Sequence, residues 1–495
     1  MTGDGEAITT NSKRLRLCDR ISSLPDSLIF CILSLLKMED VMKTTLLSKR
    51  WRYFWTAAPC LNFKASVDMI NRQQYEAFVD RALFAYEASK LKKFRLSYFF
   101  RPDSNSFQVD SWIRFVVRRD VEEMELDFIY EMRFVPTELE NYKALYKLHS
   151  SCFNSASLTR LTLRFCILNL PASMCLSSLK VLCLELLELN HDEIKKLTTC
   201  CPVLEELFLN DCNRRSDLNI CIPELPLKSL KIEEFSTDSY LGTAVEIYAP
   251  NLQLLEFHTR MQRSKYHFKG PSSLLNVRFD FVGGGIPYDE YSGHPLVDFL
   301  EDLHCAQNLN LDAWCLQALT MREMQGLPVL SLKATSLEMF TTFETWEIPG
   351  ISYMLRSCPF LETLVIAGDG SVVMKLDEDF KKRLGYRGDG RKYWQSQELI
   401  FSFVLQNVKT ITLKLFAKEN EDGEDEPIEK LFKIHQAKIE LVRVLLNSCK
   451  VLKELIITRP PYNPWADWPL DLPPTFAQYL LDMPRASPVA QMTFI

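Results

Sequence analysis

Three apolar residues at fixed spacing recur along this sequence from residue 91 onward, and no other feature constrains its fold as strongly. In each copy, one apolar residue is followed three and then five positions later by two more. The copies are Leu91, Phe94, Leu96; Val121, Met124, Leu126; Leu158, Leu161, Leu163; Leu179, Leu182, Leu184; Leu204, Leu207, Leu209; Leu227, Leu230, Ile232; Leu252, Leu255, Phe257; Leu274, Val277, Phe279; Leu327, Leu330, Leu332; Leu361, Leu364, Ile366; Val408, Ile411, Leu413; and Leu452, Leu455, Ile457. Between Leu158 and Leu274 the copies start 21, 25, 23, 25 and 22 residues apart, and a period of roughly 20 to 29 residues is typical of solenoids built from strand-containing repeats.

The spacing within each copy predicts a short strand. The last two apolar residues lie two positions apart, so both side chains point to the same face of an extended chain. The connection after each strand should then run along the outer side of the solenoid. Residues 191–201 fit an outer helix, since Asn190 and Glu193 have the spacing of a capping box. Residues 351–358 and 439–449 repeat that arrangement.

The segment before the repeats has a different, helical pattern. Pro25 suits the first position of a helix, and apolar residues follow it at helical spacing up to Leu36. Asp40 suits the cap of a second helix, and a third helical run is predicted for residues 49–55. Three short helices bury too little apolar surface to be comfortably stable alone. We therefore expect this segment to bind a partner.

Composition and charge favour an intracellular protein and leave a peptide or protein partner open. The chain has 495 residues and a net charge of -6, from 58 basic and 64 acidic residues, which favours neither nucleic acid nor an anionic membrane as a partner. No window holds 18 uninterrupted apolar residues and the start lacks an export signal, so we expect no membrane association. The fifteen cysteines are then expected to be reduced. The expected location is the nucleus, the cytoplasm or both.

Motifs that carry chemistry are missing from the sequence. No Cys-x-x-Cys pair and no zinc-like histidine spacing occurs, and the phosphate-loop, dinucleotide-binding and nucleophile-elbow patterns are also lacking. We therefore expect no catalytic residue, no metal site and no cofactor.

Residues 21–63 strongly resemble the plant-type F-box. The matching positions include Leu24-Pro25 at the start, the apolar run through Leu36, and Ser48-Lys49-Arg50-Trp51. The resemblance implies that this segment docks a Skp-type adaptor and, through it, a cullin. The residues to which it assigns adaptor contact are Leu24, Pro25, Leu28, Ile32, Leu33, Leu47, Ser48 and Trp51. The sequence leaves open which aliphatic members of this set only pack the F-box itself.

The repeats resemble the plant F-box and leucine-rich-repeat family, whose turns often read Cys-Pro-x-Leu-Glu-x-Leu. Residues 201–207 and 358–364 follow that pattern, and residues 449–455 are a degenerate copy that resembles the FBD module of the family. The expected fold class is α/β, with a short N-terminal three-helix F-box followed by an irregular leucine-rich-repeat solenoid. The expected domains are a disordered tail over 1–18, the F-box over 19–64, the solenoid over 90–460 with loops at 371–398 and 418–428 and an FBD-like end at 400–460, and a cap or tail over 461–495.

This resemblance implies a non-catalytic subunit of a ubiquitin ligase that holds an unidentified protein substrate. On a solenoid the substrate would meet the concave strand side, at side chains between and just after the buried pairs. These residues are Arg164, Glu185, Phe208, Asn210, Glu256, His258, Arg278 and Asp280. Two alternatives remain open from the sequence: a co-receptor for a small-molecule hormone on the same scaffold, and an interaction scaffold that acts outside the ligase.

Overall fold

The computed structural model describes residues 20–64, 72–100, 106–128, 145–212, 216–235, 243–259, 263–270, 273–281, 294–368, 388–415, 432–433, 435–458 and 474–495. The chain divides into two compact units, Met1–Leu145 and Tyr146–Ile495. The predicted tail over 1–18 lies outside the described residues.

The first unit begins with two short helices, α1 (Asp26–Leu35) and α2 (Met38–Thr44), and a 3-10 helix, η1 (Phe54–Ala57). Pro25 stands at the N-cap of α1, as its fixed φ allows. Lys37 is the N-cap of α2, so Asp40 lies inside the first turn of that helix instead of capping it. The third helical run predicted over 49–55 consists of turns that end in η1. Trp51 and Trp55 are nevertheless both buried there.

The rest of the first unit already has the architecture of the repeats. Its three strands are parallel and pair in chain order, and two helices connect them. The elements are β1 (Cys60–Lys64), α3 (Arg72–Phe84), β2 (Lys93–Ser97), α4 (Ser106–Val117) and β3 (Glu123–Asp127). Helices α1 and α2 pack against β1. The first repeat strand therefore begins at Cys60 and lies directly against the N-terminal helices, well before the predicted solenoid start at residue 90.

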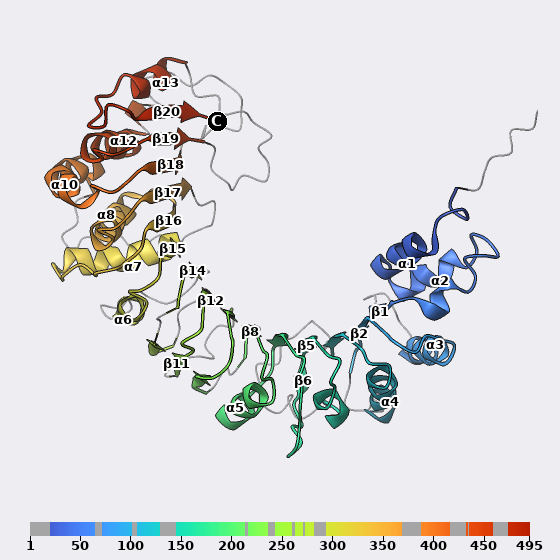
Figure 1. Cartoon of the computed structure of the whole chain (residues 1–495). Helices are drawn as coiled ribbons and strands as arrows, with labels where there is room; N and C mark the ends of the chain where they lie inside the picture. The colour runs from blue at the N-terminus through green and yellow to red at the C-terminus, as the bar shows by residue number, and fades with distance from the viewer. Residues whose placement is uncertain are drawn as a thin grey trace, which may run out of the picture. The chain divides into compact units, whose positions relative to one another are not determined.

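The second unit is a continuous parallel ladder of strands (Figure 1). The strands, in the order in which they pair, are β5 (Arg160–Arg164), β7 (Val181–Glu185), β8 (Glu206–Asn210), β10 (Ser229–Glu234), β12 (Leu254–Thr259), β14 (Asn276–Phe281), β15 (Asn308–Leu311), β16 (Ser336–Thr341), β17 (Thr363–Gly368), β18 (Thr410–Lys414), β19 (Glu454–Ile457) and β20 (Gln491–Phe494). Chain order and pairing order coincide, so each repeat stacks on the one before it, as in a solenoid. The predicted α/β solenoid fold is confirmed.

The apolar triplets explain where the strands form. In β5, for example, Leu161 and Leu163 are buried and the residues between and beside them face outward, with Leu158 buried at the preceding turn. The same holds for every predicted triplet except Leu327, Leu330, Leu332. Those residues precede β16 and form no strand, although Leu330 and Leu332 are buried.

Three strands that the triplet pattern missed share one property. The first apolar position of β1, β15 and β16 is alanine, at Ala58, Ala306 and Ala334. All three alanines are buried and stand three residues before the first inward residue of their strand. Alanine thus takes the turn position that a larger apolar residue takes in the other repeats.

In the second unit, the helices lie along the outer side of the ladder and the strands form its inner side, as Figure 1 shows. They are η3 (Ser150–Phe153), α5 (His191–Thr199), α6 (His294–Asp302), α7 (Ala313–Met324), η4 (Thr345–Glu347), α8 (Ile348–Ser357), α10 (Gly390–Val404), α12 (Gln436–Ser448) and α13 (Pro474–Leu481). The predicted capping box of α5 is present: the Glu193 N–H donates to Asn190 Oδ1 over 2.9 Å, and the Asn190 N–H donates to Glu193 Oε2 over 2.8 Å. Helices α8 and α12 match the other two predicted outer helices.

Short strands replace the outer helix in the middle repeats. They form a parallel sheet in the order β13 (Lys265–Lys269), β11 (Ala244–Tyr248) and β9 (Leu218–Cys221), and a second pair is β4 (Tyr146–Lys147) with β6 (Cys166–Ile167). Helix α6 packs against β13, and α5 packs against β9. Asp302 of α6 accepts the Phe268 N–H over 2.9 Å. Both edges of this sheet are thus covered, which keeps them from pairing with another chain.

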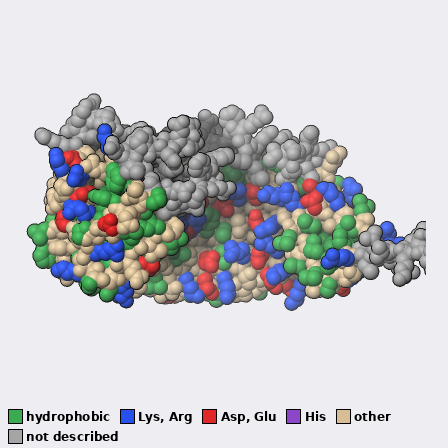
Figure 2. Space-filling model, turned by 90° about the horizontal axis from the view of Figure 1, so that it is seen from above, with side chains coloured by type: hydrophobic (Ala, Val, Ile, Leu, Met, Phe, Trp, Pro, Cys, Tyr) green, Lys and Arg blue, Asp and Glu red, His purple; other side chains and the backbone are tan. Residues whose placement is uncertain are grey.

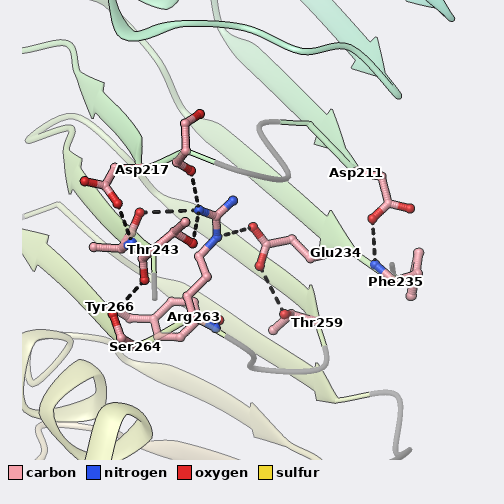
Figure 3. Close-up of polar contacts among 11 residues, drawn as sticks. Asp211, Asp217, Glu234, Phe235, Thr243, Thr259, Arg263, Ser264 and Tyr266 are labelled. Atoms are coloured by element: carbon pink, nitrogen blue, oxygen red, sulfur yellow. Dashed lines mark hydrogen bonds and ion pairs between the residues drawn. The ribbon is translucent and has the colours of Figure 1, made fainter. Parts of the chain in front are cut away.

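A buried ion pair joins three of these middle repeats (Figure 3). The side chains of Arg263 and Glu234 are 0% and 2% exposed, and Arg263 Nε donates to Glu234 Oε1 over 2.8 Å. Arg263 Nη1 also donates to the Ser216 carbonyl over 2.9 Å and to Thr243 Oγ1 over 3.0 Å. Thr259 Oγ1 donates to the second carboxylate oxygen of Glu234. One guanidinium therefore links the main ladder to the small outer sheet.

One of the loops predicted in the C-terminal repeats is shorter than expected. Helix α10 begins at Gly390, so residues 390–398, predicted as the end of a 371–398 loop, are helical. The predicted loop at 418–428 and residues 371–387 of the other predicted loop lie outside the described residues. In the C-terminal segment, α13 buries Phe476 and Leu480, and β20 adds to the ladder beside β19.

Candidate functional site

The N-terminal helices expose an unusual amount of apolar surface. Helix α1 buries Ile29 and Leu33 on one side. A neighbouring side of the helix presents Leu28, Ile32 and Leu35, which are 49%, 38% and 81% exposed. The residues that follow α2 add two more leucines, Leu46 and Leu47, that are 86% and 51% exposed. We call the exposed residues Ile21, Leu28, Ile32, Leu35, Leu46 and Leu47 the N-terminal apolar surface.

The structure separates the predicted adaptor-binding residues into three groups. Pro25, Leu28, Ile32 and Leu47 are exposed, and Leu24 and Ser48 are half-buried. Leu33 and Trp51 are buried inside the unit, where they support the surface from beneath.

Sequence reasoning missed Ile21, Leu35 and Leu46. Helical spacing alone would have found Leu35, because Leu28, Ile32 and Leu35 stand at i, i+4 and i+7 and therefore share a face.

Polar contacts fix the segment that leads into α1. Arg50 Nη1 donates to the Ser22 carbonyl over 2.5 Å, and the same guanidinium forms an ion pair with Asp26 at the start of the helix. Trp51 Nε1 donates to the Ile21 carbonyl over 3.3 Å. These contacts hold the residues around Pro25 against the end of the helical segment. The surface is therefore preformed in the free chain, which lowers the entropic cost of binding.

A second candidate surface is the strand face, defined as the side of the main ladder opposite the helices. All eight predicted substrate-binding residues lie on it, in two rows set by strand register. The residues at the fifth position of successive strands are Arg164, Glu185, Asn210, Glu233, His258 and Asp280. The residues at the third position include Phe208, Lys231, Glu256 and Arg278. The prediction missed Lys231 and Glu233, which the same offset from the triplet at Leu227 would have given.

Charges on the strand face are largely balanced by their neighbours. Arg164 and Glu185 are 2.6 Å apart, Lys231 and Glu233 are 2.7 Å apart, and His258 Nδ1 lies 3.3 Å from Asp280. The hydrogen bond with His258 lowers the pKa of Asp280. The Lys231 ammonium also lies 5.1 Å from the ring centre of Phe208. Figure 2 shows basic and acidic side chains intermixed on the face in view, so net charge alone would not select a ligand.

Reactive groups are scarce in the part of the chain that the structure describes. No cluster of three or more His, Cys, Asp or Glu side chains suited to a metal ion occurs there. None of the described helices combines the length and the apolar character needed to cross a bilayer. Burial raises the pKa of the Cys201, Cys358 and Cys449 thiols to about 12. These repeat-turn cysteines are therefore packing residues with little thiolate.

Comparisons with known proteins match both the N-terminal segment and the repeats. The model of the At1g61320/AtMIF1 LRR domain matches residues 85–387, and the model of the F-box domain matches residues 21–61. Putative F-box/LRR-repeat protein At3g18150 of Arabidopsis thaliana is 30% identical over 384 residues, covering 75% of each chain. Putative F-box protein At1g49610 of the same plant is 30% identical over 70% of this chain and 84% of its own. Putative F-box/FBD/LRR-repeat protein At1g66300, also from that plant, is 28% identical over 71% of this chain and 76% of its own.

Proposed function

The chain belongs to the F-box/LRR-repeat family, and from that premise we propose that it is the substrate-recognition subunit of a Skp-cullin-F-box ubiquitin ligase. The N-terminal apolar surface docks a Skp-type adaptor, which connects the chain to a cullin. The strand face of the repeats binds a protein substrate. The subunit itself needs no cofactor and performs no chemistry. It acts in the nucleus, the cytoplasm or both.

The observation that carries this proposal is the split of α1 into a buried and an exposed apolar face. A soluble helix normally keeps apolar side chains on one stripe and polar ones on the other. Here Ile29 and Leu33 fill the core while Leu28, Ile32 and Leu35 face solvent. Contiguous exposed apolar residues mark sites of protein association. Two leucines beyond α2 add to the exposed set, so the partner gains several aliphatic anchors.

The proposed mode of binding is a helix in a groove, anchored at i, i+4 and i+7 positions. Complete burial of one such side chain is worth roughly 1.5–3 kcal/mol. Part of this gain offsets the lost translational and rotational freedom of the two partners. Because Arg50 and Trp51 already hold the surface in place, little further ordering is needed.

The contribution of the repeats to ubiquitination is positional. A substrate held on the strand face stays close to the conjugating enzyme that the cullin carries, which raises the effective concentration of its lysines. The mixed, internally paired charges suit specificity, because a partner that displaces one side chain of a pair leaves the other without its counter-charge.

The test is a binding titration of the purified full-length chain against a purified Skp-type adaptor. The variant Leu28→Ala/Ile32→Ala/Leu47→Ala removes three exposed anchors. It should weaken binding by at least about 100-fold, because truncating a central anchor commonly costs about 2 kcal/mol. The melting temperature should stay close to that of the wild type, since all three residues are exposed.

The matched control is Leu399→Ala, which truncates a 72% exposed leucine on α10 and should leave adaptor affinity unchanged. If the wild-type chain does not bind the adaptor, the ligase assignment is wrong. If the wild type binds and the triple variant binds equally well, the adaptor uses another surface.

A further inference from the structure

Two cysteines lie together where the chain turns into strand β7. The Leu176 N–H donates to the carbonyl of Cys200 over 2.9 Å. The Cα atom of Cys175 is two bonds from the donor nitrogen, and the Cα atom of Cys200 is two bonds from the acceptor oxygen. The two Cα atoms therefore lie within about 8 Å of one another. Disulfides span Cα separations of roughly 4.4–6.8 Å. The separations at which a disulfide forms fall within this bound.

Both backbones are held in place by further hydrogen bonds. The Cys175 N–H donates to the Phe153 carbonyl over 3.0 Å and to Asn154 Oδ1 over 3.2 Å. Cys200 is the C-cap of α5, and its N–H donates to the Lys196 carbonyl over 3.1 Å. The closeness of the two cysteines is thus a fixed feature of consecutive repeats.

The two thiols differ in access to solvent. Cys175 is exposed and Cys200 is half-buried, and both are free. Burial and then the neighbouring Cys175 raise the pKa of Cys200. An influence of one thiol on the other agrees with the short separation set by the backbone hydrogen bond. The exposed thiol is the one that a dissolved oxidant reaches first.

We propose that Cys175 and Cys200 form an oxidative modification site, in which a hydroperoxide converts the two thiols into a disulfide. In the first step the Cys175 thiolate attacks hydrogen peroxide: an S–O bond forms, the O–O bond breaks, and one water leaves. In the second step the Cys200 thiolate attacks the resulting sulfenic acid: the S–S bond forms, the S–O bond breaks, and a second water leaves. The two thiols lose two electrons, and the peroxide gains them.

The bridge ties the segment before β7 to the end of α5, and so joins two consecutive repeats covalently. It closes a loop of about one repeat, which restricts the unfolded chain and stabilises the folded one. Cys201 is adjacent in sequence, but it is buried and faces the core. The geometry therefore assigns Cys200, and not Cys201, as the resolving thiol.

The experiment treats the purified full-length chain with hydrogen peroxide, blocks the remaining thiols and maps linked peptides by mass spectrometry. The wild type should yield a peptide pair joined between Cys175 and Cys200. In Cys200→Ser the pair should disappear, and Cys175 should be trapped as a sulfenic-acid adduct by dimedone. The variant Cys221→Ser, which removes another exposed cysteine, should behave like the wild type.

Two results would overturn the proposal. One is a wild-type chain in which Cys175 is oxidised to sulfinic acid without any linked pair. The other is a link from Cys175 to Cys201, identified by the fragment ions of the joined peptides. Cys200 is a half-buried cap residue and Cys221 is exposed. Circular dichroism of Cys200→Ser and Cys221→Ser should therefore show a folded chain, so a missing link reports on chemistry and not on unfolding.

Discussion

At the scale of single residues, the ion pair of Arg263 and Glu234 shows how a charge is stabilised in the interior of this solenoid. Isolated buried charges are costly, whereas a pair with full hydrogen bonding is tolerated. Arg263 donates to Glu234, Thr243 and the Ser216 carbonyl, so its charge and its N–H groups find partners in three repeats. Burial raises the pKa of Glu234, and Arg263 opposes that rise. We infer that each residue stabilises the fold mainly by neutralising the buried charge of the other.

The substitution Arg263→Met should destabilise the chain by about 3–5 kcal/mol, because it leaves the Glu234 carboxylate buried without its counter-charge. The measurement is urea unfolding followed by tryptophan fluorescence. Arg278→Met is the matched control: it removes an exposed arginine from the strand face and should change stability by less than about 0.5 kcal/mol. The double variant Arg263→Met/Glu234→Leu should recover much of the loss. Equal effects of Arg263→Met and Arg278→Met would show that the buried pair does not hold the repeats together.

At the scale of elements, the sequence predicts strands well and their outer connections poorly. Leucine triplets located most strands because two inward positions and one turn position must all be filled by apolar groups. Ala58, Ala306 and Ala334 hid three strands, since alanine is common everywhere and carries little signal. The error at Leu330 and Leu332 has a different origin. Both residues are buried, but in the turn before β16 and not in a strand.

The outer sheet of β9, β11 and β13 was not predicted, because its strands lie between the triplets and are short. Their inward residues, such as Ile220 and Phe268, fit either a helix or a strand when only two or three apolar positions are available. For the adaptor-binding candidates, resemblance supplied the residues, and the packing of the N-terminal helices then divided them into exposed and buried sets. That division needs the packing partner of each face, which a single sequence does not contain.

The contact between α7 and α8 depends on one glycine. A Cβ atom at Gly350 would stand 1.9 Å from the Leu316 carbonyl oxygen, and the Gly350 N–H donates to Thr320 Oγ1 over 2.8 Å. Gly350→Ala should therefore force the helices apart and cost about 3 kcal/mol, at the upper end for overpacking. Thermal unfolding measures the effect.

The matched control for Gly350→Ala is Gly326→Ala, which meets no atom within 4 Å but has φ of +68, and which should cost only about 1 kcal/mol. A smaller loss for Gly350→Ala than for Gly326→Ala would mean that the two helices have room to separate.

At the scale of the whole molecule, the surfaces that we propose for adaptor binding and for substrate binding belong to different units of the chain. The N-terminal helices pack on the first repeat strand of their own unit, whereas the predicted substrate residues belong to the second unit. In a stack of repeats, each repeat is stabilised mainly by its neighbours. A disturbance at one end of the second unit should therefore fade over a few repeats.

Deleting residues 474–495 tests that locality. The segment buries Phe476 and Leu480, pairs β20 with β19, and donates from Ser487 Oγ to the Leu452 carbonyl over 2.6 Å. Its loss should speed amide hydrogen exchange strongly in α12 and β19, less in α8, and negligibly in β5 to β8, while adaptor affinity stays within about twofold. Val489→Ser, at an exposed site in the same segment, is the control and should leave exchange unchanged. Uniformly faster exchange across the second unit would mean that its repeats unfold as a single cooperative block.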